Sequence, residues 1–174
     1  YPADEKTDDL LLLTSLQKGG GEEYFNASAA FRDFNDDYRL YMPASLYHNE
    51  HETKTIAAQA GGRHLVSDPI RAVWRISADQ EQLASDSLGH HRRAHGALTL
   101  IPDLRAGRWL FAAGVRQEVF EHEKPASLPQ AGITWNAAEG QSIALSAGRA
   151  VRRPSYTELN YESPASLGNQ GLDP

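Results

Sequence analysis

The sequence contains no cysteine and no long apolar run. Without thiols, the 174 residues can form neither disulfides nor thiolate zinc sites, so a small secreted fold held together by disulfides is excluded. The longest aliphatic stretch is residues 10–13, whereas a membrane-spanning helix needs about 20 consecutive apolar residues. A helical membrane protein is therefore excluded as well.

An excess of basic residues is also missing. Lysine and arginine number 17 against 23 aspartates and glutamates, for a net charge of -6. Nucleic-acid binders usually carry a basic stripe, so we expect no nucleic-acid partner. The mean hydropathy of -0.54 is compatible with a transmembrane β-barrel, because barrel strands alternate apolar and polar residues and give no strong hydropathy peak.

Motifs of catalysis are absent from the sequence. It contains no nucleophile elbow, phosphate loop, glycine-rich dinucleotide motif or zinc-protease motif. Ser146 is interpreted as a small polar strand residue and not as a nucleophile. We therefore predict that the protein is not an enzyme and that it has no catalytic residue and no cofactor.

A histidine cluster offers a possible metal site. It consists of His90, His91 and His95, with Arg92 and Arg93 among them. On a strand, His91 and His95 would share a face that His90 opposes. The two arginines favour a positively charged rim facing anionic lipid or ligand, so no metal site is predicted.

The dominant pattern has a period of two residues, which predicts strands with two different faces. It is clearest at residues 109–120, where an apolar face opposes one that holds Gly114, Arg116 and Glu118. The same reasoning predicts about nine strands. Their ranges are 9–17, 23–34, 38–46, 51–61, 69–78, 89–101, 109–120, 130–136 and 142–151.

The predicted connections alternate in length. Turn formers at 35–37, 103–107 and 137–140 indicate short turns, whereas 43–50, 79–88, 121–127 and the residues from 154 onward indicate longer loops. This alternation is typical of outer-membrane barrels, whose long loops lie outside the cell. Aromatic residues near strand ends suggest a girdle at the membrane interface, namely Tyr24, Phe25, Tyr41, Trp74, Trp109 and Trp135.

The end of the sequence carries an ordered set of motifs. It reads Arg149-Ala-Val-Arg-Arg-Pro-Ser-Tyr-Thr-Glu-Leu159 and later Gly168-Asn-Gln-Gly-Leu-Asp-Pro174. This set resembles a signature of TonB-dependent outer-membrane receptors, although Arg153 and Gln170-Gly171 depart from it. The residues that match are Gly114, Arg116, Arg152, Pro154, Ser155, Tyr156, Glu158, Leu159, Gly168, Asn169, Leu172 and Pro174.

Most of these motif residues have a structural explanation. Pro154 cannot donate to a strand ladder, so pairing should stop there. Ser155 and Glu158 have the spacing of a helix capping box. Gly168 and Asn169 permit a positive φ and a sharp reversal. The sequence therefore predicts a structured loop, and it identifies no ligand-binding residue.

The resemblance implies an all-β, antiparallel up-and-down transmembrane β-barrel, of which residues 1–174 form only part. A plug domain and the remaining strands would lie outside this chain. The implied function is uptake of a scarce nutrient, such as a siderophore or cobalamin, energised through TonB in the bacterial cell outer membrane. Implied partners are outer-membrane lipid, a small ligand such as a metal chelate, and TonB, contacted through a part not in this chain.

Two alternatives stay open on the sequence. The first is a soluble extracellular β-sandwich that binds glycans or protein, and the second is a simple outer-membrane porin or barrel enzyme. A barrel and a soluble sandwich would place the charged pairs on different sides. In a barrel, Arg116 with Glu118 and Arg71 with Arg75 would line the wet interior. In a soluble sandwich the same side chains would face outside.

Overall fold

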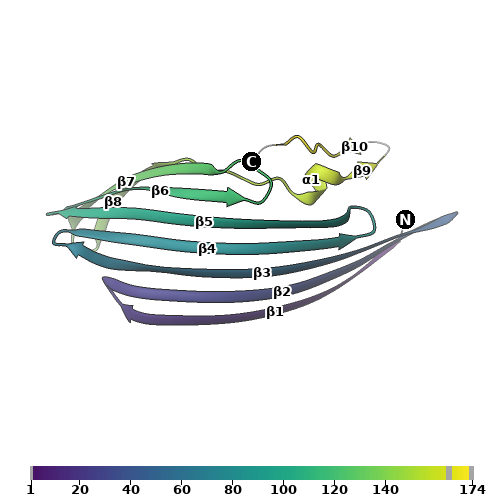
Figure 1. Ribbon diagram of the computed structural model, residues 1–174, viewed down its shortest axis with the longest axis horizontal. Helices are drawn as coiled ribbons and strands as arrows, with labels where there is room; N and C mark the ends of the chain where they lie inside the picture. Colours follow the sequence, from purple (N-terminus) through teal and green to yellow (C-terminus); the bar gives the residue numbers. More distant parts are fainter. Residues whose placement is uncertain (1, 164–165, 173–174) are drawn as a thin grey trace.

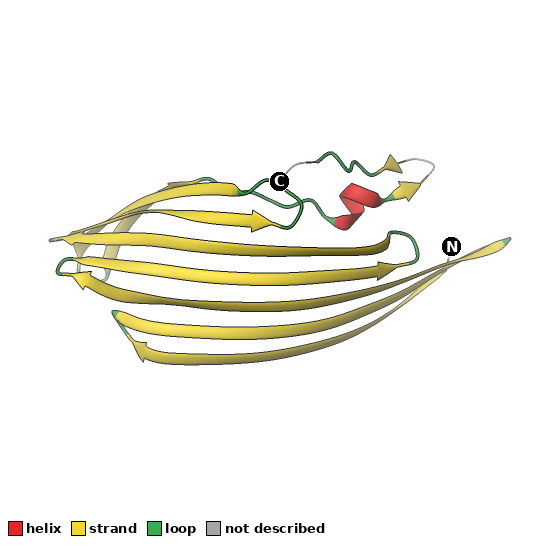
Figure 2. Cartoon of the chain, in the orientation of Figure 1, coloured by secondary structure: helices red, strands yellow, loops and turns green. Residues whose placement is uncertain are grey.

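The computed structural model describes residues 2–163 and 166–172. Eight strands form one antiparallel sheet in which each strand pairs with its neighbours in the chain (Figures 1 and 2). The strands are β1 (Ala3–Gly20), β2 (Glu23–Met42), β3 (Ser45–Ser67), β4 (Ile70–Ser85), β5 (Gly89–Ala106), β6 (Trp109–Phe120), β7 (Ala126–Ala138) and β8 (Gln141–Gly148).

The two ends of the sheet differ in their connections. At the short-turn end, each connection has only two residues, at 21–22, 68–69, 107–108 and 139–140. Gly21, Gly107 and Gly140 adopt positive φ there, as tight hairpins require. The loop end holds the connections at 43–44, 86–88 and 121–125 and the chain that follows β8. Figure 1 shows the short-turn end on the left and the loop end on the right.

Four of the predicted connections are wrong. Residues 35–37 lie inside β2, most of 43–50 and 79–88 belongs to β3 and β4, and 103–106 belong to β5, which turns only at 107–108. The sheet therefore has eight strands where about nine were expected. The turn formers stay extended because side chains pair along the sheet: Asp37 accepts hydrogen bonds from Arg39 at 2.7 Å and contacts His48 at 2.8 Å.

One face of the sheet is apolar. Residues paired across the strands share a face, so the register defines a row running through Ile70, Leu104, Phe111, Ile133 and Leu145. Four of these side chains are 38–72% exposed. A continuous apolar surface of this kind is rare on a soluble monomer. The apolar face thus fits a surface that meets lipid.

The apolar face changes character sharply toward the loop end. On β2, Phe31 is the last apolar residue of that face before Asp33, and on β3 Ile56 is followed toward the loop end by Lys54. The strands continue beyond this boundary, since β2 has 20 residues and β3 has 23. A tilted strand needs only about 9–11 residues to cross a bilayer. The long strands therefore extend well beyond the apolar band.

Aromatic rings mark the opposite border of the apolar face. Phe25 and Trp74 lie with centroids 6.2 Å apart, and Trp109 stacks on Trp135 at 5.9 Å. All four belong to the apolar face near the short-turn end. The predicted girdle is thus present in these four residues. Tyr24 instead faces the other side, and Tyr41 lies near the far tip of β2.

The opposite face is polar and contains the buried hydrophobic and polar side chains of the sheet. Among the residues whose burial is described, four apolar residues are buried, and the register places all four on this polar face: Leu83, Ala97, Phe120 and Leu128. Six polar residues are buried on the same face: Asn49, Arg71, Ser85, Thr99, Asp103 and Glu118. This inverts the usual arrangement of a soluble domain, whose buried residues are mostly apolar.

The sheet is a single open layer. Its outermost strands, β1 and β8, each pair on one side only, so it does not close on itself. The only other sheet in the described part of the chain has two short strands, and no second sheet covers the apolar face. A β-sandwich needs two packed sheets, so the soluble alternative does not fit. In the same described ranges, no helix is long and apolar enough to cross a membrane.

Candidate functional site

The chain that follows β8 folds over the loop end of the sheet. Strand pairing stops at Gly148, three residues earlier than predicted, and the Arg149 N–H still donates to the Pro129 carbonyl. Helix α1 (Tyr156–Asn160) follows, and then a hairpin of β9 (Glu162–Ser163) and β10 (Ser166–Leu167) (Figure 1). We call residues 149–172 the covering segment, with the part at 164–165 outside the described residues.

Arg93 holds the covering segment against the polar face. Its Nη1 donates to the Pro154 carbonyl at 2.9 Å, while its guanidinium lies 4.2 Å from the centre of the Tyr156 ring. His91, from the same strand, stacks on Tyr156 with centroids 5.3 Å apart. Burial raises the pKa of the Tyr156 hydroxyl. The Tyr156 ring thus contacts two side chains of β5, Arg93 and His91.

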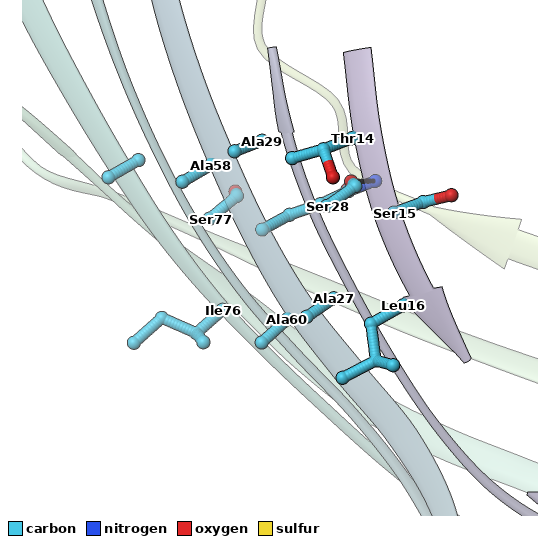
Figure 3. A pocket seen from close by; sticks show the side chains of 12 residues that line it. Thr14, Ser15, Leu16, Ala27, Ser28, Ala29, Ala58, Ala60, Ile76 and Ser77 are labelled. Carbon is cyan, nitrogen blue, oxygen red and sulfur yellow. Dashed lines mark hydrogen bonds between the residues drawn. The ribbon is translucent and has the colours of Figure 1, made fainter. Parts of the chain in front are cut away.

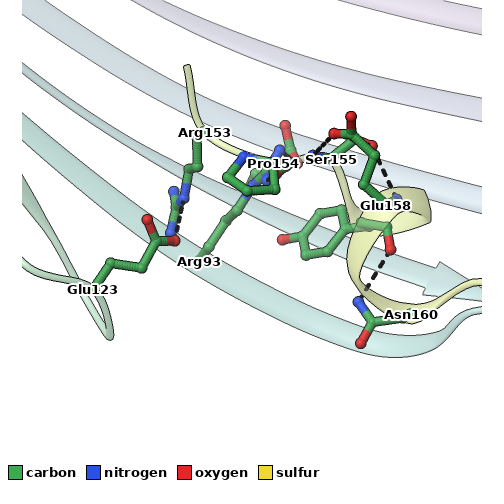
Figure 4. Close-up of polar contacts among 9 residues, drawn as sticks. Arg93, Glu123, Arg153, Pro154, Ser155, Glu158 and Asn160 are labelled. Atoms are coloured by element: carbon green, nitrogen blue, oxygen red, sulfur yellow. Dashed lines mark hydrogen bonds and ion pairs between the residues drawn. The ribbon is translucent and has the colours of Figure 1, made fainter. Parts of the chain in front are cut away.

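Arg153 makes a second attachment (Figure 4). Its Nε donates to Glu123 at 3.0 Å, and its guanidinium lies 5.4 Å from the centre of the Phe120 ring. Glu123 belongs to the loop at 121–125, and Phe120 is the last residue of β6. Arg153 departs from the family pattern, and these contacts explain what the arginine does in this chain. It ties the covering segment to the loop beside it.

The predicted capping box is confirmed. Ser155 is the N-cap of α1; its side chain accepts a hydrogen bond from the Glu158 N–H, and the Glu158 carboxylate accepts one from the Ser155 N–H. Arg152 adds a bidentate pair to Glu158 at 3.0 and 2.8 Å. These donors, the Arg152 guanidinium first among them, lower the pKa of Glu158 to about 2. Arg152 and Glu158 thus stabilise the start of the helix.

Gly168 allows the backbone of the covering segment to pack closely. Neither Gly168 nor Asn169 has a positive φ, so that prediction is wrong. A Cβ on Gly168 would lie 2.7 Å from the backbone nitrogen of Asn160, which leaves no room for a side chain. The Gly168 N–H donates to the Tyr161 carbonyl, and the Asn169 backbone N–H donates to the Glu158 backbone carbonyl. Leu159 and Leu172 lie in the same segment, and Pro174 lies outside the described residues.

Glycine is also required at position 114 for steric reasons. A Cβ there would meet the Leu100 carbonyl oxygen at 2.3 Å and the Ile101 Cα at 2.7 Å. The β5–β6 ladder has no paired partners for Ile101 and Pro102, because proline cannot donate a ladder hydrogen bond. The two strands approach closely at this point, and only glycine fits without displacing backbone.

A chain of polar contacts crosses the polar face below the covering segment. Arg116 donates to Glu118 at 2.6 Å and to Thr99 at 3.4 Å. His95 contacts Asp79 at 2.8 Å and lies 3.8 Å from Glu118. The His95 ring also stacks on Phe120, which Arg153 covers. The covering segment is therefore connected to buried charges of the sheet.

The histidine cluster is divided between the two faces. His91 and His95 lie on the polar face with separate partners, whereas His90 and Arg92 share the face of Lys54 and Gln82. Arg93, predicted to belong to a charged rim, is instead paired with Glu81 at 2.8 Å. Within residues 2–163 and 166–172, no group of three potential ligands could hold a metal ion.

The apolar face has a shallow hollow of about 500 Å³ over β1 to β4 (Figure 3). Its floor consists of small side chains, including Ala27, Ala29, Ala58 and Ala60. Leu16 and Ile76 border it in Figure 3. The hollow arises because small residues of adjacent strands are paired in the register.

Sequence reasoning missed several residues at this site. Nothing in the spacing of Glu81, Glu123 or Phe120 indicates that they meet Arg93 and Arg153, because these partners lie 12 to 33 residues apart in the sequence. The alternation did place Phe120 on the face of Arg116 and Glu118. This shared face was the feature of the sequence that could have indicated that Phe120 belongs to the site.

Comparisons with known proteins agree with this architecture. Residues 7–174 match the family model described as the TonB dependent receptor-like β-barrel. The siderophore receptor PirA from Pseudomonas aeruginosa is a similar solved structure, with 12% identity and a TM-score of 0.56. The match covers 97% of this chain but 41% of that receptor, so this chain spans well under half its length.

A second similar structure is the β domain of the Bordetella autotransporter Brka. It has 14% identity and a TM-score of 0.41, over 83% of this chain and 68% of that one. No curated protein matches the sequence. At these identities, the PirA likeness shows the fold alone.

Proposed function

Because the chain belongs to the TonB-dependent receptor β-barrel family, a family of transporters and not of enzymes, we propose that it forms part of the wall of an outer-membrane receptor that takes up a scarce nutrient. The observation that carries this proposal is the exposed apolar row from Ile70 to Leu145, opposite a face that holds the buried charges. Such a sheet is stable where lipid covers one side and a polar interior the other.

The two edges of the sheet support the proposal that this wall is partial. β1 and β8 each expose an unpaired edge, and an open edge is not tolerated within a bilayer. Further strands of the same receptor would therefore complete the barrel, and a plug domain outside these 174 residues would occupy it. The PirA match, which covers 41% of that chain, agrees with this division.

The proposed location is the bacterial outer membrane, and the orientation follows from the connections. Connections that are all short are typical of the periplasmic side of outer-membrane barrels, whereas the loop end holds longer connections at 86–88 and 121–125 beside the two-residue turn at 43–44. The covering segment and the loop at 121–125 would then face the outside of the cell. Lipid would contact the apolar face between the aromatic border at Trp74 and the charges at Lys54.

The substrate class we propose is a metal chelate such as a siderophore or cobalamin, taken up with energy delivered through TonB by another part of the receptor. A strain deleted for this gene should lose uptake of its own siderophore loaded with radioactive iron, or of radiolabelled cobalamin. A second strain, deleted for tonB, should lose the same uptake while its receptor level stays normal.

Two outcomes would contradict this proposal. Receptor-dependent uptake that persists without TonB would indicate a simple porin. Unchanged uptake of both probes in the receptor-deleted strain would exclude the substrate class. Membrane fractionation of the parent strain tests the location separately, since the receptor should appear with the outer membrane.

A further inference from the structure

Three arginines meet on the polar face at the short-turn end, far from the covering segment. Arg63, Arg71 and Arg105 come from the adjacent strands β3, β4 and β5. Arg63 pairs with Asp103 at 2.7 Å, while Arg71 and Arg105 both reach Glu22, at 2.6 and 3.4 Å. Three guanidiniums thus share two carboxylates, and positive charge is in excess.

Arg71 is the buried member of this group. Its side chain is 8% exposed, and within the described residues its Nε and Nη1 have no hydrogen-bond partner. Arg63 Nε is likewise buried and has no partner among these described residues. Buried charged groups are normally fully hydrogen-bonded, because desolvation without compensation is unfavourable. The free donors therefore indicate that an acceptor belongs here.

We propose that Arg63, Arg71 and Arg105 form a binding site for a small oxyanion, a phosphate or a carboxylate group. The guanidinium presents its donors as a planar fork that matches two oxygens of one anion. This site is independent of which nutrient the receptor transports, because it is defined by donors on the wall itself.

Glu22 shows that the site accepts a carboxylate. It lies in the two-residue turn between β1 and β2, its side chain is 59% exposed, and its Oε2 accepts from Arg71. Its pKa is lowered, first by the Arg71 hydrogen bond and further by the charges of Arg105 and Arg63. An exposed turn residue can move aside, so Glu22 is an internal competitor that an incoming anion displaces from Arg71.

Asp103 sets a limit on the charge of the ligand. It faces Arg71 in the register, and its buried Oδ1 has no partner in the part of the chain that the structure describes. Once an anion displaces Glu22, Asp103 is the carboxylate of the group that stays, and among the described residues the three arginines then leave two positive charges in excess. A doubly charged hydrogenphosphate fits this balance, because its oxygens accept from the arginines and its hydroxyl can donate to Asp103.

The test uses the whole receptor, purified in detergent, and inorganic phosphate as the probe. Isothermal titration at low ionic strength should show saturable binding. R71Q should weaken it about tenfold or more, since a charge-assisted bidentate contact is lost. E22Q should tighten it severalfold, because the competing carboxylate is gone. R108Q is the matched control: Arg108 lies in a neighbouring turn, and within the described part of the chain its side chain hydrogen-bonds only to the Ala137 carbonyl.

If the R71Q receptor does not fold, R105Q provides the same test, because Arg105 is half exposed and should tolerate substitution. It should also weaken phosphate binding. The proposal is overturned if the wild-type receptor shows no saturable binding, if E22Q does not tighten it, or if R108Q weakens it as much as R71Q or R105Q. Phosphate binding needs no energised uptake, so each result is separate from the fate of the proposed transport function.

Discussion

The guanidinium of Arg93 lies 4.2 Å from the centre of the Tyr156 ring, and this contact joins the sheet to the covering segment. Arg93 is fixed from the other side by Glu81, which accepts from both its Nε and its Nη2. The first residue of helix α1 is thus positioned by a strand residue that lies 63 residues earlier in the sequence. Four predictions follow from contacts of this kind.

Loss of the Tyr156 ring should loosen the covering segment. Y156A removes the cation–π contact with Arg93 and the stack on His91, together about 1–2 kcal/mol. Trypsin should then cut after Arg152 several times faster in the folded receptor, as followed on gels. Y161A is the control, because Tyr161 is exposed at the end of the same helix. Equal cleavage rates in the two variants would contradict this role of Tyr156.

Gly114 should not accept even a methyl group. G114A places a Cβ 2.3 Å from the Leu100 carbonyl oxygen, so backbone must shift, at a cost of about 1–3 kcal/mol as for other overpacked positions. When unheated samples are run on a denaturing gel, the band of the folded receptor should be weaker for this variant than for the wild type. G132A is the matched control, since its Cβ would meet its nearest atom at an ordinary 3.5 Å. A normal band for G114A would refute the close approach.

The two faces should respond oppositely to charge. V115R puts arginine on the apolar face, which near the bilayer centre costs about 2–4 kcal/mol. A112R puts the same side chain on the polar face of the same strand, opposite Asp103, and should be tolerated. Denaturant titration of the receptor in lipid vesicles, followed by tryptophan fluorescence, measures both. Equal losses would mean that the faces have been assigned wrongly.

Acid should release the start of α1. The pKa of Glu158 is about 2 in the folded chain against a reference of 4.5. The stabilisation that the ionised Glu158 side chain gives to the start of α1 is therefore complete above pH 4.5. The contribution is lost as the pH falls from 4.5 toward about 2. NMR of the receptor with carbon-labelled glutamate should show this late titration. R152Q should move it back toward the reference value, and an unchanged titration would count against the ion pair.

Alternation predicted the fold best where one side of the sheet meets lipid. From β6 to β8, apolar and polar residues alternate nearly without interruption, and the predicted faces agree with the register. At residues 35–37 both sides of β2 lie beyond the apolar band, so nothing selects apolar residues there. Polar residues that resemble a turn then continue a strand, which ion pairs such as Asp37 with Arg39 support.

The candidate site was predictable only in its local parts. The capping box involves residues three apart, so Ser155 and Glu158 could be paired from spacing. The contact between Arg71 and Glu22 spans 49 residues and depends on the register of three strands. Sequence spacing carries no information on such contacts until strand order and register are known.

The pairing of each strand only with its neighbours in the chain has a consequence for how the wall is built. Every hairpin can form as soon as its two strands are available, and the sheet can grow one strand at a time without long-range closure. Growth leaves one fresh edge at every stage, which will accept any compatible strand. Assembly should therefore be sequential and directional, and it should depend on a factor that shields the growing edge.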